Sequence, residues 1–241
     1  MILFILIAGL SCSKSSVLDC FNSTGKITQT DRSISEFHSI VLNDNVNLYL
    51  RQSDQNKLVL EAGSNLMSKI YTEVNDAGYL EIGNDNSCNW VRSFDKPITV
   101  YLDFVQLDSL KYRSIGNVSN EDTIRMDTLV VDVYEGAGKI ELTVNTYKMN
   151  TNLHYGTADI FTSGKAVVSY VYLAGFGKID NRALDVKHVY LNNKSSNDIY
   201  IYSSNTIGAT IENIGNIFYT GNPGSISLNK IGPGNLIKIE N

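Results

Sequence analysis

The chain has 241 residues, a mass of 26.7 kDa, a net charge of −5 at pH 7 and a sequence pI of about 5.2. A weakly acidic chain without a dense Lys/Arg block is poorly suited to hold a polyanion by counterion release, so we exclude nucleic acid as a partner. A hydrophobic fraction of 43% with 10% aromatic residues is typical of a globular protein and excludes a disordered or collagen-like chain.

The first twelve residues predict a signal peptide. Residues 2–10 are an apolar run that would rise only about 14 Å as a helix, which is too short to span a bilayer. The run ends at Ser11 and Cys12, and small residues just before a cysteine resemble the lipobox of bacterial lipoproteins. Gly9 stands where a lipobox usually has leucine, and no positive charge precedes the run. The resemblance implies a lipidated Cys12; an uncleaved anchor and ordinary secretion are the alternatives.

A lipidated Cys12 would place the protein in the bacterial cell envelope, with the membrane reached through the lipid anchor. Ser13 after Cys12 is compatible with transport to the outer membrane, and residues 13–31 are expected to form a tether and an N-terminal segment. In an oxidising compartment, Cys20 and Cys88 are expected to form a disulfide, with two free thiols as the alternative. The chain has no CxxC pair and no Cys/His spacing typical of zinc, so we expect no metal site.

Residues 32–104 predict an N-terminal part rich in β-strands. Apolar and polar residues alternate in residues 46–50, 79–82 and 98–102, which is the period of half-buried strands. Asn- and Gly-rich turns separate these segments, because both residues tolerate the positive φ that tight turns need. The only helical turn that we expect lies around residues 64–70.

Residues 105–241 contain an internal repeat. A small residue is followed two positions later by an aliphatic residue or alanine, and an alternating segment lies upstream of each such pair. The repeats begin, at spacings of 18 to 22 residues, at Gly116, Gly138, Gly156, Gly177, Asn197, Gly215 and Gly234. About twenty residues suffice for one coil of two or three short strands with tight corners, and successive coils stack about 4.8 Å apart.

These features predict an all-β fold, namely a parallel β-solenoid with coils of about twenty residues that follows the strand-rich N-terminal part. An antiparallel sandwich also gives short strands with regular turns, and it is the rival fold. We favour the solenoid because a sandwich needs no likeness between successive strands. The absence of long segments with a period of 3.6 residues excludes an all-helical or doubly wound fold.

Residues 61–82, the Gly-rich repeats and residues 212–223 (ENIGNIFYTGNP) together resemble the head GIN domain family of bacterial auto-transporter adhesins. The likeness covers roughly residues 32–240, and the stretches around Cys20 and Cys88 resemble the lipoprotein branch of that family. The resemblance implies a β-solenoid built in two parts and an adhesin-like role. A likeness of fold does not by itself carry a mechanism.

A search for catalytic patterns finds none. His38, His154 and His188 belong to no HExxH or Ser/His/Asp arrangement, although stacking of coils could bring His154 and His188 near each other. Acidic residues recur after the small residue of the repeats and could form a line of carboxylates along one face, able to collect a cation or act on a polysaccharide. They are Glu141, Asp159, Asp180 and Asp198. A phosphate-binding GxxxxGK motif is absent, and we expect no cofactor.

Tyrosine is the enriched residue type that points to a binding surface, with 14 in the chain. Where aliphatic neighbours face the core, the alternation turns the intervening tyrosines outward. The candidate binding face consists of Tyr134, Tyr170, Tyr172, Tyr190, Tyr200 and Tyr202. Such a row presents flat apolar rings edged by hydroxyl groups, which suits sugars or proteins, although tyrosine ladders also simply stabilise sheets.

We therefore expect a non-enzymatic lipoprotein whose solenoid presents an extended face to a glycan or an envelope protein. A structural or assembly module of the envelope is the first alternative, and a polysaccharide-acting enzyme that uses the line of carboxylates is the second. The flat ends of a solenoid expose unpaired strand edges, so a homo-oligomer is also expected.

Overall fold

The computed structural model describes residues 23–86 and 96–240. These residues form 18 strands and no α-helix; a single 3₁₀ helix, η1 (Met67–Lys69), lies where the sequence predicts a short helical turn. Cys12, Cys20 and Cys88 lie outside the described residues, so the lipidation site and the disulfide stay predictions.

The strands fall into three groups along the chain. The N-terminal part contains β1 (Ile27–Arg32), β2 (Ser39–Asp44), β3 (Val46–Gln52), β4 (Lys57–Gly63), β5 (Ile70–Val74), β6 (Tyr79–Asn84) and β7 (Ile98–Phe104). The middle contains β8 (Ser109–Ser114), β9 (Val118–Asn120), β10 (Ile124–Gly136), β11 (Lys139–Leu153), β12 (Asp159–Leu173) and β13 (Ile179–Asn193). The C-terminal part contains β14 (Ile199–Tyr202), β15 (Thr206–Ile211), β16 (Ile217–Thr220), β17 (Ser225–Lys230) and β18 (Leu236–Lys238).

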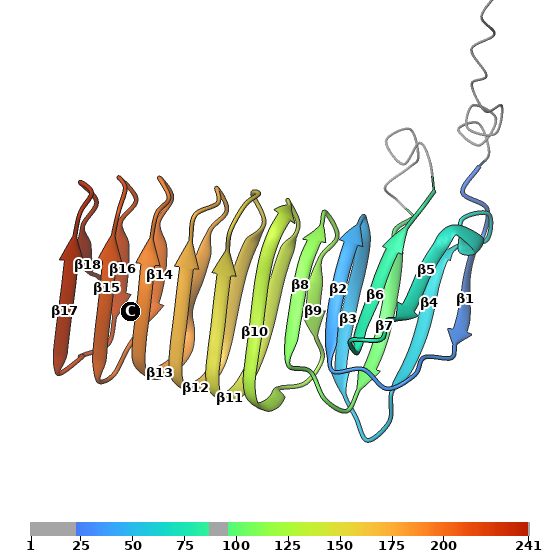
Figure 1. Cartoon of the computed structure of the whole chain (residues 1–241), viewed down its shortest axis with the longest axis horizontal. Helices are drawn as coiled ribbons and strands as arrows, with labels where there is room; N and C mark the ends of the chain where they lie inside the picture. The colour runs from blue at the N-terminus through green and yellow to red at the C-terminus, as the bar shows by residue number, and fades with distance from the viewer. Residues whose placement is uncertain (1–22, 87–95, 241) are drawn as a thin grey trace, which may run out of the picture.

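The chain winds into a parallel β-solenoid of about six turns, about 20 residues apart, which confirms the predicted fold and excludes the antiparallel sandwich. β11 pairs with β12 in parallel from Lys139 opposite Asp159 to Leu153 opposite Leu173. Figure 1 shows the coils side by side, with two layers of strands facing each other.

Each coil contributes one segment to each layer, and the long strands bend from one layer into the other. The first layer contains β1, β4, β7, β3 and β9, the N-terminal halves of β11, β12 and β13, and then β14, β16 and β18. The second layer contains β5, β6, β2 and β8, most of β10, the C-terminal halves of β11, β12 and β13, and then β15 and β17. We call the outer surface of the first layer the groove face and that of the second layer the tyrosine face.

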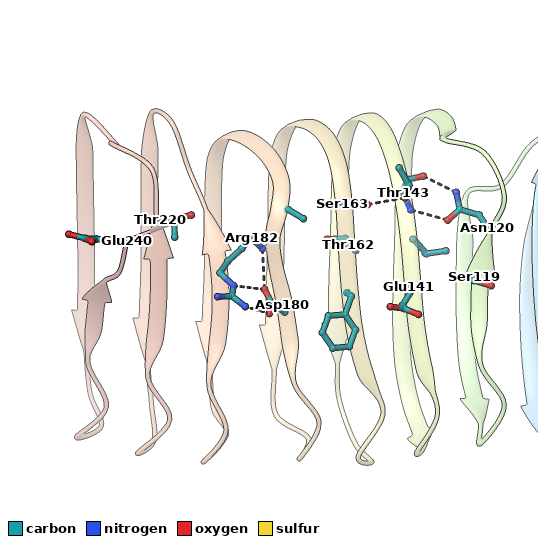
Figure 2. Close-up of a pocket in the computed structure, with 13 residues that line it drawn as sticks. Ser119, Asn120, Glu141, Thr143, Thr162, Ser163, Asp180, Arg182, Thr220 and Glu240 are labelled. Carbon is teal, nitrogen blue, oxygen red and sulfur yellow. Dashed lines mark hydrogen bonds and ion pairs between the residues drawn. The ribbon is translucent and has the colours of Figure 1, made fainter.

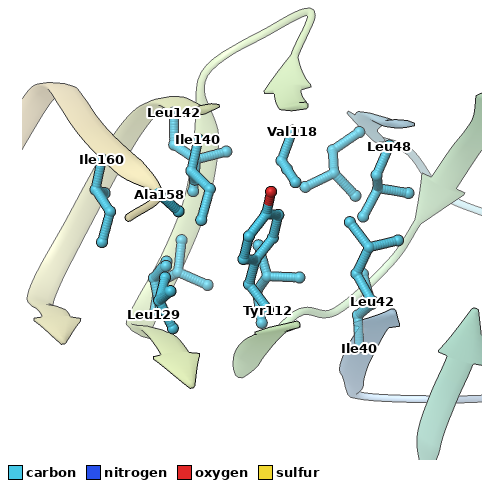
Figure 3. Packing of buried hydrophobic residues seen from close by; sticks show 14 of the residues in the cluster. Ile40, Leu42, Leu48, Tyr112, Val118, Leu129, Ile140, Leu142, Ala158 and Ile160 are labelled. Atoms are coloured by element: carbon cyan, nitrogen blue, oxygen red, sulfur yellow. The ribbon is translucent and has the colours of Figure 1, made fainter. Parts of the chain in front are cut away.

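The core lies between the two layers as one continuous cluster of buried side chains. Along β11, exposed and buried residues alternate, so every second side chain points inward. Equivalent inward residues of successive coils stand opposite one another and stack in lines, as Figure 3 shows for Val118, Ile140 and Ile160. The aliphatic residue of each repeat is therefore a core position.

The small residue of the repeat is required by the close approach of two coils at a corner. A Cβ atom on Gly177 would lie 1.9 Å from the carbonyl oxygen of Ala158, and one on Gly215 would lie 2.1 Å from that of Asn197. Such distances leave no room for a side chain that points into the preceding coil.

One predicted repeat start is wrong. Asp159 stands opposite Lys139, so Ala158, and not Gly156, occupies the place of Gly138. Gly156 has a φ of +91° and serves the longer turn between β11 and β12. The turn needs a glycine at residue 156 for this positive φ, and that glycine imitates a repeat start two residues before the true one.

The N-terminal part and the repeats share the same two layers. β2 and β3 form a coil that lies between β6 and β7 on one side and β8 and β9 on the other. β1 and β4 pair antiparallel at the N-terminal end of the first layer. The core thus runs without a break across the predicted boundary at residues 104 and 105.

Candidate binding faces

The six predicted tyrosines do not form one row, and this part of the prediction is wrong. Tyr134, Tyr170, Tyr172 and Tyr190 belong to the second layer, whereas Tyr200 and Tyr202 lie on β14 in the first layer. Alternation along a strand distinguishes inward from outward, but it does not say to which of two layers the strand belongs. The candidate face therefore divides into two.

On the tyrosine face, Tyr170 stands opposite Tyr190 in adjacent coils. Their ring centroids are 5.6 Å apart at an interplanar angle of 26°, and the two residues are 43% and 41% exposed. Gly208 follows in the same line, and the ring of Tyr190 covers it, since a Cβ there would lie 2.8 Å from Cδ1 of Tyr190. The pair stacks like a ladder and presents its ring edges to solvent.

A second aromatic group on this face includes a histidine that the sequence did not single out for binding. The ring of His154 stacks on that of Tyr134 at 4.7 Å and lies 5.3 Å from that of Tyr172. Its Nε2 atom is 3.1 Å from Oδ1 of Asp132. His188 stands opposite Val168, where β13 enters the second layer. His154 directly follows the last residue of β11, at the other end of that layer's segment. Stacking of coils therefore does not bring the two histidines together.

The groove face carries a shallow groove of about 650 Å³ over β9, β11, β12 and β13 (Figure 2). Hydroxyl and amide groups line one side of it. The backbone N–H of Thr143 donates to Oδ1 of Asn120 at 2.9 Å, and the amide of Asn120 donates back to the Thr143 carbonyl oxygen at 2.9 Å. The hydroxyls of Thr143 and Ser163 are hydrogen-bonded at 2.9 Å.

Charged and aromatic side chains form one line across the strands of the groove face. Glu141, Phe161 and Asp180 line the groove, and Tyr200 and Phe218 continue the same line on the neighbouring coils. The rings of Tyr200 and Phe218 stack at 5.0 Å with an interplanar angle of 13°. Lysines lie over the rings: Lys139 is 4.9 Å from the centroid of Phe161, and Lys178 is 4.7 Å from that of Tyr200. Cation–π attraction therefore holds these rings in place.

Asp180 is the electrostatic centre of this line. The Arg182 guanidinium donates to both of its carboxylate oxygens, at 2.9 and 2.6 Å, and Lys178 Nζ lies 2.9 Å from Oδ2. Burial alone raises the pKa of Asp180, but the hydrogen bonds from Arg182 and Lys178 outweigh it and hold the pKa below its ordinary value. Asp180 is therefore ionised at neutral pH and fixed in orientation.

A β-bulge places Arg182 beside Asp180. The register between β12 and β13 shifts so that Asn181 and Arg182 together lie opposite one residue of β12, between the pairs Phe161–Asp180 and Ser163–Ala183. Bulges re-aim side chains in this way. The sequence analysis missed Arg182, because repeat spacing carries no signal for a one-residue insertion within a strand. It missed Phe161 because the wrong repeat start at Gly156 put Asp159 in the position that Phe161 occupies.

The predicted line of four carboxylates is also wrong. Glu141 and Asp180 lie in the groove line, but Asp159 and Asp198 lie at the corner of the coils. There Asp159 accepts a 2.8 Å hydrogen bond from the backbone N–H of Lys178, and Asp198 accepts one of 2.7 Å from that of Asn216. Asn117 accepts the same kind of bond from Lys139, so these corner residues link successive coils.

Neither a metal cluster nor a membrane-spanning helix is found where the structure is described. Over residues 23–86 and 96–240, no group of three His, Cys, Asp or Glu side chains is placed to hold a metal ion. Within the same ranges, no helix has the length and apolar character needed to cross a bilayer.

The fold is an extended β-solenoid with two exposed faces, the groove face and the tyrosine face. The chain belongs to the family described as "Putative auto-transporter adhesin, head GIN domain", whose model matches residues 36–223. This match confirms the resemblance seen in the sequence and supports an adhesin-like binding module.

Several solved structures share the fold. A "putative adhesin" from Bacteroides fragilis superposes with a TM-score of 0.80 at 24% identity, covering 89% of this chain and 97% of the other. A "putative lipid binding protein" from Parabacteroides distasonis gives 0.73 at 21% identity, covering 90% and 98%. A "putative adhesin" from Parabacteroides merdae gives 0.69 at 17% identity, covering 90% and 98%. The comparison with curated proteins gave no match.

Proposed function

We propose that the protein is a non-enzymatic, lipid-anchored module of the bacterial cell envelope that binds a glycan along its groove face. The observation that carries this proposal is that the first three members of this line, Glu141, Phe161 and Asp180, line the groove, and that two stacked aromatic rings continue the line on the next coils. A sugar chain alternates apolar C–H faces with hydroxyl groups, and the line combines aromatic rings with hydrogen-bonding charged groups. Because a solenoid repeats at about 4.8 Å, successive coils offer such groups at regular intervals.

The charges of the groove favour a glycan without net charge. Lys139 Nζ is 2.6 Å from a carboxylate oxygen of Glu141, and Lys178 and Arg182 share Asp180. These three cations are balanced by three carboxylates at the groove, those of Glu141, Asp180 and Glu240. Recognition then depends on ring stacking and on pre-oriented hydrogen-bonding groups such as Asp180 and Asn120 rather than on long-range attraction.

The carboxylates support a binding role more than a hydrolytic one. Glycoside hydrolysis normally needs one carboxyl group that stays protonated to act as the acid. Asp180 has a lowered pKa, and Asp159 and Asp198 are engaged in hydrogen bonds between coils. Glu141 is held in an ion pair with Lys139.

A second candidate is that the partner, a glycan or an envelope protein, binds the tyrosine face. The exposed pair Tyr170 and Tyr190 favours it, because tyrosine is common at protein interfaces and both residues are more than 40% exposed. The two faces lie on opposite layers, so substitutions on one face can show how much that face contributes to binding.

The test compares two double variants in glycan-array and calorimetric binding experiments with neutral envelope polysaccharides. Phe161→Ser with Tyr200→Ser removes two rings of the groove face, and we expect affinity to fall about tenfold or more. Tyr170→Ser with Tyr190→Ser is the matched control and should change affinity less than about twofold. Loss of binding only in the control pair would move the site to the tyrosine face. Absence of binding by the unmodified protein to every neutral polysaccharide would overturn the glycan proposal.

Anchoring is tested separately at Cys12. In palmitate-labelled bacteria, the unmodified protein should carry label and sediment with the outer membrane, since the acyl chains of a lipidated cysteine partition into lipid. Cys12→Ser should abolish both the label and the sedimentation, whereas Cys20→Ser should keep them. Label that persists in Cys12→Ser, or an unmodified protein without label, would contradict a lipid anchor at this residue.

A further inference from the structure

We propose that the C-terminal end of the solenoid binds a second copy of this chain, tail to tail, about a two-fold axis. β17 is the outermost strand of the second layer at this end (Figure 1). All six of its residues are exposed. Ile226 and Leu228 stand opposite Ile207 and Ala209, which are buried core residues of the preceding coil. Ile226 and Leu228 therefore continue the core line but are 45% and 42% exposed, because no described coil follows them.

The outer edge of β17 also has unpaired backbone groups. The N–H of Ser225 donates to the Asn205 carbonyl oxygen at 3.1 Å, and that of Ile231 donates to the Ile211 carbonyl oxygen at 2.9 Å. Odd-numbered residues of β17 thus bond to β15, and the N–H and C=O groups of Ile226 and Leu228 point away from it. β17 has no proline, no bulge and no charge before Lys230, so it lacks the devices that usually block edge pairing.

The opposite end of the solenoid is closed. The Arg32 guanidinium, at the end of β1 in the first layer, donates to the carbonyl oxygens of Ile70 and Met67 at 2.6 and 2.8 Å. It also donates to Oγ1 of Thr72 at 3.2 Å, so it crosses to β5 in the second layer and covers the end of the core. β1 itself places Asp31 3.7 Å from Lys57 on its exposed surface. A charged, bridged end is a poor partner for β17, so head-to-tail stacking into a filament is disfavoured.

The sequence of β17 is complementary to itself in an antiparallel pair. With the axis at Ser227, Ile226 faces the partner's Leu228, and these two residues can exchange both of their free hydrogen bonds. Apolar side chains then meet on the core side, and Ser225 faces the partner's Asn229 on the outside. Lys230 faces the partner's Gly224, so no like charges oppose each other. The pairing joins the cores of the two copies into one longer solenoid. It also gives the free edge of β17 in each copy a hydrogen-bonding partner.

Sedimentation equilibrium of the purified protein, in density-matched detergent and from low to high micromolar concentration, tests the stoichiometry. We expect a monomer–dimer equilibrium, since two short strands form a small interface of modest affinity. Ile226→Lys should leave a monomer with unchanged melting, because it puts charge into the joined core. Ile115→Lys is the control, a 56% exposed isoleucine on a corner far from this end, and should still dimerise. A monomer at all concentrations, or a dimer that survives Ile226→Lys, would overturn the proposal.

A cross-link tests the register and the two-fold axis. Residues that face each other in a non-hydrogen-bonded antiparallel pair have Cα atoms about 4.5 Å apart, within disulfide range. Ser227→Cys should therefore form a disulfide-linked dimer under mild oxidation, beyond any seen for the unmodified protein. Ser225→Cys, which faces Asn229 of the partner subunit, should not. Equal cross-linking of both variants, or masses above the dimer, would rule out this two-fold pairing.

Discussion

Gly177→Ala is expected to lower the free energy of unfolding by at least about 3 kcal/mol, and the melting temperature by about 6 to 12 °C. The added methyl group would lie 1.9 Å from the Ala158 carbonyl oxygen and 3.0 Å from Cδ1 of Leu153. The carbonyl cannot move aside, because backbone atoms of the preceding coil are held by the ladder of hydrogen bonds between β12 and β13. The cost is therefore paid by separating two coils, and chemical denaturation followed by circular dichroism measures it.

Gly224→Ala is the matched control for this substitution. Gly224 lies before β17, and the nearest atoms to a Cβ there are those of Asn205 at 3.9 Å, an ordinary van der Waals contact. We expect its stability to change by less than about 0.5 kcal/mol. If both variants lost the same stability, an effect of alanine common to the two positions would explain the loss, and the close approach of coils at Gly177 would not.

Tyr112→Phe is expected to destabilise the protein by roughly 2 to 6 kcal/mol although it removes a single oxygen atom. Tyr112 is fully buried in the core (Figure 3). Its hydroxyl donates to the Gly116 carbonyl oxygen at 2.6 Å and accepts from the backbone N–H of Gly138 at 3.0 Å, so it joins two successive corners. Phenylalanine leaves both backbone groups buried without these partners, and each loses about 1 to 3 kcal/mol. Urea denaturation at pH 7 provides the measurement.

The same hydroxyl predicts a specific loss of stability in alkali. Burial raises the pKa of Tyr112 to about 12, although the hydrogen bond from Gly138 lowers it, whereas the unfolded chain ionises near pH 10. The contribution of un-ionised Tyr112 to the free energy of unfolding is complete below pH 10 and is lost as the pH rises toward 12. Over this range the tyrosine of the unfolded chain loses its proton, whereas buried Tyr112 keeps it. This amounts to roughly 2 to 3 kcal/mol at pH 12.

Tyr112→Phe supplies the reference for this pH dependence. The other tyrosines are present in both proteins, so the difference between the two stability curves isolates residue 112. The stability gap between the unmodified protein and the variant should be constant below pH 10 and should narrow above it. A gap that stays constant up to pH 12 would mean that Tyr112 ionises as easily in the folded state as in the unfolded chain.

Much of the coil architecture was predictable, because the strands and corners produce regular local patterns in the sequence. Period-two alternation identified β3, β6 and β7, and the spacing of small residues identified the corners at Gly177 and Gly215. Both signals arise from contacts between a residue and the equivalent residue of the next coil, and such contacts repeat with the sequence. The error at Gly156 has the same origin, since a glycine needed for its own positive φ imitated a glycine needed for close approach.

The candidate site was predictable only in part. Outward-facing tyrosines were correctly distinguished from inward-facing aliphatic residues, as at Tyr170 and Tyr190. The groove line was not, because the wrong repeat start at Gly156 concealed Phe161. In addition, Arg182 reaches Asp180 only through a bulge that shifts the register by one residue. A shift of this size changes which side chains are neighbours without changing any spacing between repeats.

By itself, the sequence determined that this protein is a parallel β-solenoid with one corner of small residues and an aliphatic core line, and it pointed to the adhesin family. The tertiary structure alone decided which outward residues share a face, separating Tyr190 from Tyr200 and Asp159 from Asp180. The physical reason is that alternation and repeat spacing record whether a side chain points inward and where a coil turns. The layer that a segment joins, and the register at which it pairs, are fixed by contacts between residues about twenty positions apart.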